Sequence, residues 1–148
     1  MATEASGNNS GTMDPVEVEY FDWDPGDSPV SIHMHLGAMD GIARDVIEGF
    51  GALPRPDLEI GGLLLGRVEN RERPEVWIER YQRITCSHRF GPHFILDRED
   101  RDALENAAAT ILESGDLVVV GFYRSQTRPG LQLEVSDFEM MRQYFSDP

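Results

Sequence analysis

Hydrophobic and polar residues follow two kinds of spacing along this chain, and each spacing predicts a type of secondary structure. Val30, Ile32 and Met34 alternate with polar residues, which is typical of a half-buried strand. Between residues 39 and 50 the apolar positions recur at spacings of three and four, which predicts an amphipathic helix. Its expected buried stripe is Met39, Ile42, Ala43, Val46, Ile47 and Phe50.

The middle of the chain predicts a series of strands. Residues 60–68 are almost continuously apolar, as expected of a strand covered on both faces. A second strand is predicted over 76–84 and a short third one over 94–96, with a loop between them. The inward residues of the second strand are expected to be Val76, Ile78, Tyr81 and Ile84.

The last third predicts two helices around one strand. Asp97 is expected to cap a helix that runs to about Ser114, with Leu104, Ala107, Ala108, Ile111 and Leu112 on its buried side. Residues 117–123 (LVVVGFY) form the strongest candidate for a buried strand. Ser136 and Glu139 have the spacing of a capping box for a final helix that carries Phe138 and Met141. The order of elements predicts an α/β (α+β) fold, a mixed β-sheet flanked by helices.

The N-terminal segment differs in composition from the rest. Residues 1–28 contain seven acidic residues and no arginine. Such a segment buries too little apolar surface to offset its ordering entropy, so we expect a largely disordered arm and an ordered domain over 29–148. Disorder is predicted for 1–15, whereas 16–23 fits either a short strand or a docking motif.

Charge and composition restrict the classes of partner. The formal net charge of −14 argues against nucleic acids and anionic membranes, which need a basic surface. The favoured explanation of this charge is a solvated, soluble surface, and the alternative is an acidic surface that steers a basic protein partner. No run approaches the roughly 18 apolar residues of a membrane span. Cys86 is the only cysteine and no signal peptide is evident, so a cytoplasmic location is expected.

Two segments together resemble the JAMM/MPN metallopeptidase family. Residues 59–66 (EIGGLLLG) are similar to the family's strand that begins with its catalytic glutamate. Residues 119–126 (VVGFYRSQ) are similar to the strand that ends in the two zinc-binding histidines. Ten residues then separate Gln126 from Asp137, which is the family's spacing to its aspartate ligand. The resemblance covers residues 30–148 and implies the family's cytidine-deaminase-like architecture.

The departures from that family concern its chemistry. The two histidine positions hold Arg124 and Gln126, and arginine has no lone pair to donate to a metal. Glu134 stands where the family has an oxyanion-stabilising serine, and a carboxylate there would repel a developing oxyanion. Only Glu59 and Asp137 remain, as vestiges of the catalytic set. We therefore expect no zinc, no cofactor and no catalytic residues.

The substitution suggests an electrostatic replacement for the metal. If Glu59 and Asp137 still converge, they need a nearby positive charge. Our hypothesis is that Arg124 bridges Asp137, and Glu59 as well.

Two other groups of residues are candidates for a metal site. His33 and His35 share a strand face, and two solvent-facing histidines are the favoured interpretation there. Cys86, His88 and His93 have loose spacing, which favours loop packing over a soft-metal site.

The sequence thus favours a non-catalytic module for protein interaction or scaffolding, working with a protein partner or by self-association. One alternative is a zinc hydrolase with altered ligands, in which His88 or His93 joins Asp137 and Glu59 is the general base. Another is a small-anion sensor in which Arg124 grips the ligand. Members of the family continue into another core strand after the last helix, so the chain is expected to be a piece of a longer protein.

Overall fold

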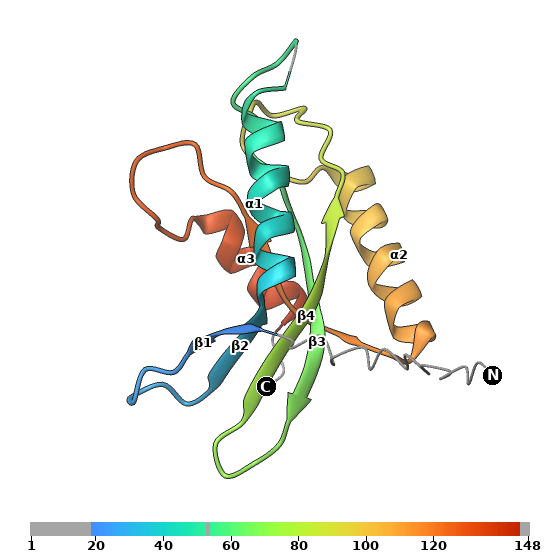
Figure 1. The fold of residues 1–148 in the computed structure, drawn as a ribbon. Helices are drawn as coiled ribbons and strands as arrows, with labels where there is room; N and C mark the ends of the chain where they lie inside the picture. The colour runs from blue at the N-terminus through green and yellow to red at the C-terminus, as the bar shows by residue number, and fades with distance from the viewer. Residues whose placement is uncertain (1–18, 53, 146–148) are drawn as a thin grey trace, which may run out of the picture.

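The computed structural model describes residues 19–52 and 54–145, which contain both strands and helices (Figure 1). In chain order these elements are β1 Tyr20–Trp23, β2 Ser31–His35, α1 Leu36–Phe50, β3 Gly61–Glu69, β4 Glu75–Ile84, α2 Arg98–Ser114, β5 Val118–Arg124 and α3 Val135–Tyr144. The predicted class, a mixed sheet flanked by helices, is confirmed.

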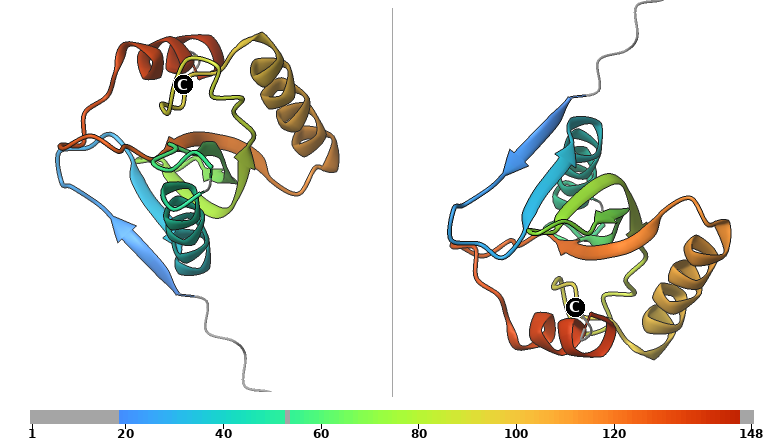
Figure 2. Two further views of the ribbon diagram at one scale, coloured as in Figure 1. Left: turned by 90° about the horizontal axis from the view of Figure 1, so that it is seen from above. Right: turned by 90° about the horizontal axis from the view of Figure 1, so that it is seen from below.

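The strands form one sheet in the order β1-β2-β4-β3-β5. β2 and β4 are parallel, and the other neighbouring pairs are antiparallel. Helix α1 covers one face of the sheet, whereas α2 and α3 lie on the opposite face (Figure 2). Gly61 at the start of β3 pairs with Arg124 at the end of β5. This register brings the residue just before β3 close to the loop that follows β5.

Each helix begins with a recognisable signal. Helix α2 starts at Asp97, whose side chain and that of Asp100 form a reciprocal capping box, and Gly115 ends it at φ 74°. The capping box of α3 is formed by Glu134 and Asp137, not by Ser136 and Glu139 as predicted.

In the described part of the chain, no helix combines the length and apolar character that crossing a membrane requires.

The main core lies between α2 and the sheet, and two glycines allow its strands to approach each other. Its buried residues are Leu63, Leu65, Ile84, Phe94, Leu96, Leu104 and Ile111. A Cβ added at Gly62 would overlap the carbonyl oxygen of Gln82, and one at Gly66 would overlap that of Trp77. The apolar run of β3 therefore depends on glycine where it lies against the backbone of β4.

The N-terminal boundary of the ordered domain lies earlier than predicted. Residues 1–18 are outside the described residues, but Tyr20–Trp23 forms β1 and pairs with β2. The Tyr20 hydroxyl donates a 2.7 Å hydrogen bond to Glu79 on β4. These contacts anchor part of the expected arm, so a boundary at residue 29 is too late, and the strand interpretation holds for residues 20–23.

The predicted strand over 94–96 is wrong. No strand is described there, although Phe94 and Leu96 are both buried in the core. The Phe94 N–H donates to the carboxylate of Glu59 instead of to a neighbouring strand. The side chain of Glu59, distant in sequence, thus accepts the hydrogen bond that a strand over 94–96 would have made within the sheet.

The sequence also overestimated how much of several elements is buried. The run over 117–123 was expected to be the most buried strand, yet β5 lies at an end of the sheet and Val118 is exposed. Leu104 and Ile111, two turns apart, form the buried line of α2, and Leu112 lies outside it. The other exposed apolar residues of the segments expected to be buried are Ala43, Ile47, Phe50 and Val68.

Replacing Gly66 with alanine should destabilise the protein by about 3 kcal/mol or more, because a backbone oxygen in the core cannot move aside cheaply. The matched control is Gly121→Ala on β5. The closest atom to its added Cβ would be Leu64 Cδ1 at 3.6 Å, an ordinary contact. Urea denaturation of both variants measures the effect. Equal losses of stability in the two variants would contradict the role given to Gly66.

Candidate functional site

Glu59, two residues before the start of β3, is a buried carboxylate whose two oxygens both accept hydrogen bonds. The residue is 1% exposed. Oε2 accepts from the Phe94 N–H at 2.9 Å, and Oε1 contacts His93 Nδ1 at 3.1 Å. Oε1 also accepts from the Thr127 N–H at 3.2 Å and from its hydroxyl at 3.3 Å. One carboxylate therefore holds the loop before α2 and the loop after β5.

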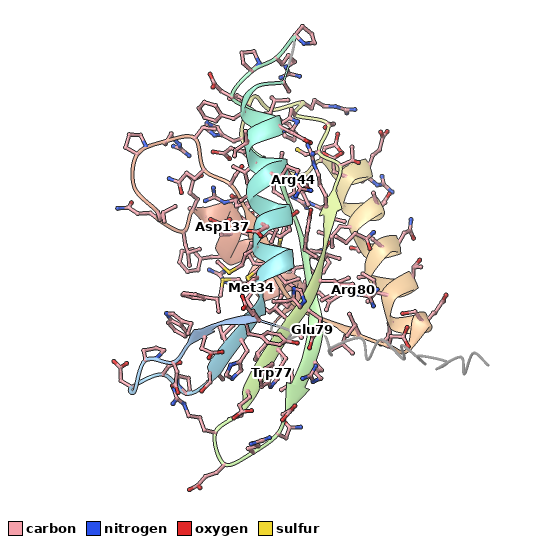
Figure 3. The ribbon with its side chains drawn as sticks, in the orientation of Figure 1. Met34, Arg44, Trp77, Glu79, Arg80 and Asp137 are labelled. Carbon is pink, nitrogen blue, oxygen red and sulfur yellow. The ribbon has the colours of Figure 1, made fainter. Side chains whose placement is uncertain are left out.

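Arg124, the last residue of β5, forms a two-pronged ion pair with Asp137 in the first turn of α3. Nε donates to Oδ1 and Nη2 donates to Oδ2, both at 2.6 Å. Asp137 is 3% exposed, and Figure 3 labels it at the start of α3. This parallel arrangement is the strongest that arginine makes with a carboxylate. The hypothesis that Arg124 bridges Asp137 is confirmed.

Glu59 is the second carboxylate near this guanidinium. Arg124 Nη1 lies 3.8 Å from Glu59 Oε2, which is an ion-pair distance without a hydrogen bond. The expected convergence of Glu59 and Asp137 on Arg124 is therefore present, but it is unequal. Asp137 binds the guanidinium directly, whereas the main partners of Glu59 are backbone N–H groups and the side chains of His93 and Thr127.

Asp137 also caps its own helix. Its Oδ2 accepts from the Glu134 N–H at 2.7 Å, and its N–H donates to the Glu134 carbonyl at 3.0 Å. A negative charge in the first turn is favoured by the helix dipole. Asp137 thus starts α3 and ties it to β5 with the same carboxylate.

The pKa values of both buried carboxyl groups lie below their usual values. Burial raises the pKa of Glu59, but hydrogen bonds from the Phe94 N–H, His93 and the Thr127 N–H lower it below 4.5. Burial likewise raises the pKa of Asp137, and hydrogen bonds from the Arg124 guanidinium and the Glu134 N–H lower it below 3.8. Both groups are therefore anionic at neutral pH.

Several supporting residues were missed by the sequence reasoning. Ser125 joins the strand ends, since its hydroxyl accepts from the Ile60 N–H at 2.9 Å and its own N–H donates to the Ile60 carbonyl at 2.7 Å. Thr127 and the Phe94 N–H complete the shell of Glu59. No spacing pattern identifies these groups, because the fold alone brings the two loops together.

Gln126 and Glu134, the two other positions that depart from the JAMM/MPN pattern, have different surroundings. Gln126 lines an open cleft of about 530 Å³ that Arg124 and Asp137 also line. Glu134 forms an ion pair with Arg128 on a more exposed part of the same loop. The carboxylate of Glu134 is thus neutralised by a cation of its own.

The candidate ligands Cys86, His88 and His93 do not converge on a common point. Cys86 Sγ donates to the Ile95 carbonyl at 3.6 Å, and His88 Nε2 lies 2.8 Å from the Glu59 carbonyl oxygen. His93 faces the Glu59 carboxylate. Within residues 19–52 and 54–145, no group of three or more histidine, cysteine, aspartate or glutamate residues could hold a metal ion.

His33 and His35 were expected to face solvent, and this is wrong for His33. Its ring stacks on Trp77 with centroids 4.0 Å apart, and its Nδ1 lies 2.6 Å from Asp22 Oδ1. The reason is that β1, which was not counted in the sheet, brings Asp22 to that histidine. His35 accepts from the Gly37 N–H instead. Trp77 lies on the part of β4 away from Asp137 (Figure 3).

Comparison with known proteins adds no family assignment. Neither the family models nor the curated proteins searched contain a match to this sequence. The interpretation of the site therefore depends on its residues and their geometry.

Replacing Arg124 with methionine should cost about 3–5 kcal/mol, because it leaves the Asp137 carboxylate buried without its cation. The matched control is Arg128→Met, whose partner Glu134 is more exposed, with an expected loss below about 1 kcal/mol. Urea denaturation measures both. Adding Asp137→Asn to Arg124→Met should restore part of the stability, since it removes the uncompensated charge. Equal losses in the two single variants would contradict a structural role for the pair.

The cost of Arg124→Met should also depend on pH. The folded-state pKa of Asp137 is depressed, so its stabilising contribution is fully present above the ordinary value of 3.8 and is lost as the pH falls through the lower folded-state value. The stability difference between wild type and Arg124→Met should therefore be largest near neutral pH and shrink below about pH 4. Denaturant titrations across this range test it. A difference that grows on acidification would be the opposite of this expectation.

Proposed function

We propose that this chain is a non-catalytic JAMM/MPN-like module for protein interaction or scaffolding, in which Arg124 stands in the place of the metal. The observation that carries the proposal is the buried, two-pronged pair between Arg124 and Asp137. Aspartate is the only zinc ligand of the family's pattern that this sequence keeps. Here both of its oxygens bind a guanidinium.

The chemistry of the surrounding groups supports this proposal. Zinc needs donors with free lone pairs, and a guanidinium has none to offer. Both oxygens of Glu59 already accept hydrogen bonds from protein groups. Its role as a base toward a metal-bound water would require breaking these contacts. The arrangement is that of a structural ion-pair centre.

The two alternative functions fit the contacts less well. A hydrolase with altered ligands needs His88 or His93 beside Asp137, but these rings contact the Glu59 carbonyl and carboxylate. An anion sensor needs a guanidinium available to its ligand. Nε and Nη2 of Arg124 both donate to Asp137, so an anion would have to displace an internal carboxylate.

Zinc binding by a variant tests the proposal. The double variant Arg124→His/Gln126→His places two histidines at positions that line the same cleft as Asp137. After dialysis against trace zinc, wild type should retain less than about a tenth of an equivalent, and the double variant close to one. Arg128→His is the matched control, because it adds a histidine in the same loop away from Asp137.

Elemental analysis of the dialysed proteins gives the answer. Stoichiometric zinc in wild type would overturn the proposal of a metal-free centre. A double variant that folds but takes up no zinc would show that the site lacks JAMM/MPN geometry, and the resemblance would then fail.

A further inference from the structure

β5 lies at one end of the sheet and lacks the features that normally protect an exposed strand edge. Its sequence, VVVGFYR, has no proline, and its only charge is at the last residue. The strand at the other end, β1, contains Asp22 and is followed by Asp24 and Pro25. Charges and prolines on edge strands discourage pairing with further chains. The β5 edge therefore remains suited to an additional strand.

The backbone hydrogen bonds show which groups of β5 point away from the sheet. The Ser125 N–H donates to the Ile60 carbonyl, so it faces β3. Successive residues of a strand alternate in direction, so the Tyr123 N–H also faces β3, whereas those of Arg124 and Phe122 face outward. Among the described residues, no backbone hydrogen bond joins these outward groups to another segment.

An apolar cleft of about 530 Å³ runs along this edge. Five consecutive residues, 120–124, line it. Because neighbouring side chains point to opposite faces of a sheet, a cleft lined by consecutive residues must follow the strand's edge and not one face. Its opposite wall is formed by the loop before α3 and by α3 itself, through Leu131, Gln132, Leu133, Met141 and Phe145.

The wall of this cleft carries exposed apolar side chains. Leu131 is 95% exposed and Leu133 59% exposed. The guanidinium of Arg124 donates to the Gln132 carbonyl at 3.4 Å, which holds this part of the loop opposite β5. Clustered apolar side chains of this kind mark interaction surfaces. Here they lie next to unpaired backbone groups, which is the combination that an extended peptide requires.

We propose that the cleft between β5 and residues 131–133 binds an extended segment of a basic partner polypeptide, which adds to the sheet beside β5. The inference rests on the proposed interaction function and names its surface and the chemistry of its partner. The partner's backbone would pair with Phe122 and Arg124, and its apolar side chains would cover Leu131 and Leu133.

The charge of the chain decides between possible occupants. At a formal net charge of −14, two copies of this protein repel each other, whereas a basic chain is attracted. A second copy is therefore disfavoured, although β5 could pair with itself in geometric terms. The expected segment alternates apolar residues with arginine or lysine.

Amide hydrogen exchange with a defined peptide tests this proposal. The probe is the acetylated and amidated peptide RVTVRVTV at millimolar concentration. Exchange at Phe122 and Arg124 should slow by roughly tenfold, because protection follows the population of the paired state. Exchange at Gly121 and Tyr123, which already face β3, should change little. A control peptide with proline at its third and sixth positions lacks donors on both edges and should give no protection.

Variants of the wall and of the peptide's charge complete the test. Leu131→Asn/Leu133→Asn should reduce the protection at least about fivefold without changing the fold, since both residues are exposed. Leu112→Asn, a 69% exposed leucine on α2, is the matched control. Replacing the arginines of the peptide with glutamate should weaken binding.

Two results would overturn the proposal. One is unchanged exchange at Phe122 and Arg124 with the arginine peptide. The other is protection that appears without peptide and rises with protein concentration, which would mean that a second copy occupies the edge. Either result leaves the zinc measurements unaffected, so failure of this surface can be distinguished from failure of the metal-free centre.

Discussion

A guanidinium buried against a carboxylate joins the last strand of this protein to its last helix. Arg124 ends β5, Asp137 lies in the first turn of α3, and residues 125–134 form the loop between them. Two charges removed from water are tolerated only when their geometry is good and their remaining hydrogen-bonding groups are satisfied. The Glu134 N–H and the Gln132 carbonyl provide that satisfaction. The pair therefore fixes the start of α3 and helps to position the loop before it.

Glu59 has a similar organising role on the other side of the guanidinium. It draws together the Phe94 backbone, the His93 ring and Thr127, groups that are distant in sequence. In a metalloenzyme such loops are commonly fixed by the ligands of the ion. Here a network of one carboxylate and its donors fixes them, and the Arg124 charge lies close enough to offset its cost. Hydrogen bonds and ion pairs thus connect the described residues of this centre.

The sequence predicted the elements well where they depend on local pattern. Asp97 and Gly115 are local signals, and they defined α2 correctly at both ends. The prediction that Arg124 pairs with Asp137 was also confirmed, because it required only that Glu59 and Asp137 lie close to each other in the fold. Predictions from local pattern were wrong where contacts between distant parts of the sequence decide the structure. Phe94 lost its predicted strand to Glu59, and His33 became packed because β1 joined the sheet.

The same limit explains the misjudged burial of β5. Its run of valines is typical of a central strand, but strand order is a property of the whole topology and leaves it with one neighbour. Likewise, the spacing of apolar residues in α2 correctly predicted that Leu104 and Ile111 are buried. It could not show that so few residues of this helix are buried. Thr127 and Ser125 carried no signal at all, because their roles exist only once two loops meet.

The pair between Arg124 and Asp137 has a consequence for how this protein can evolve. If Arg124 is lost first, the buried carboxylate of Asp137 is left without its cation. If Asp137 is lost first, the guanidinium of Arg124 is left without its carboxylate and α3 loses its capping side chain. Replacing both residues with neutral side chains avoids the buried unpaired charge that either single replacement leaves. Mutations at these two positions are therefore epistatic, because the effect of changing one residue depends on whether the other is still present.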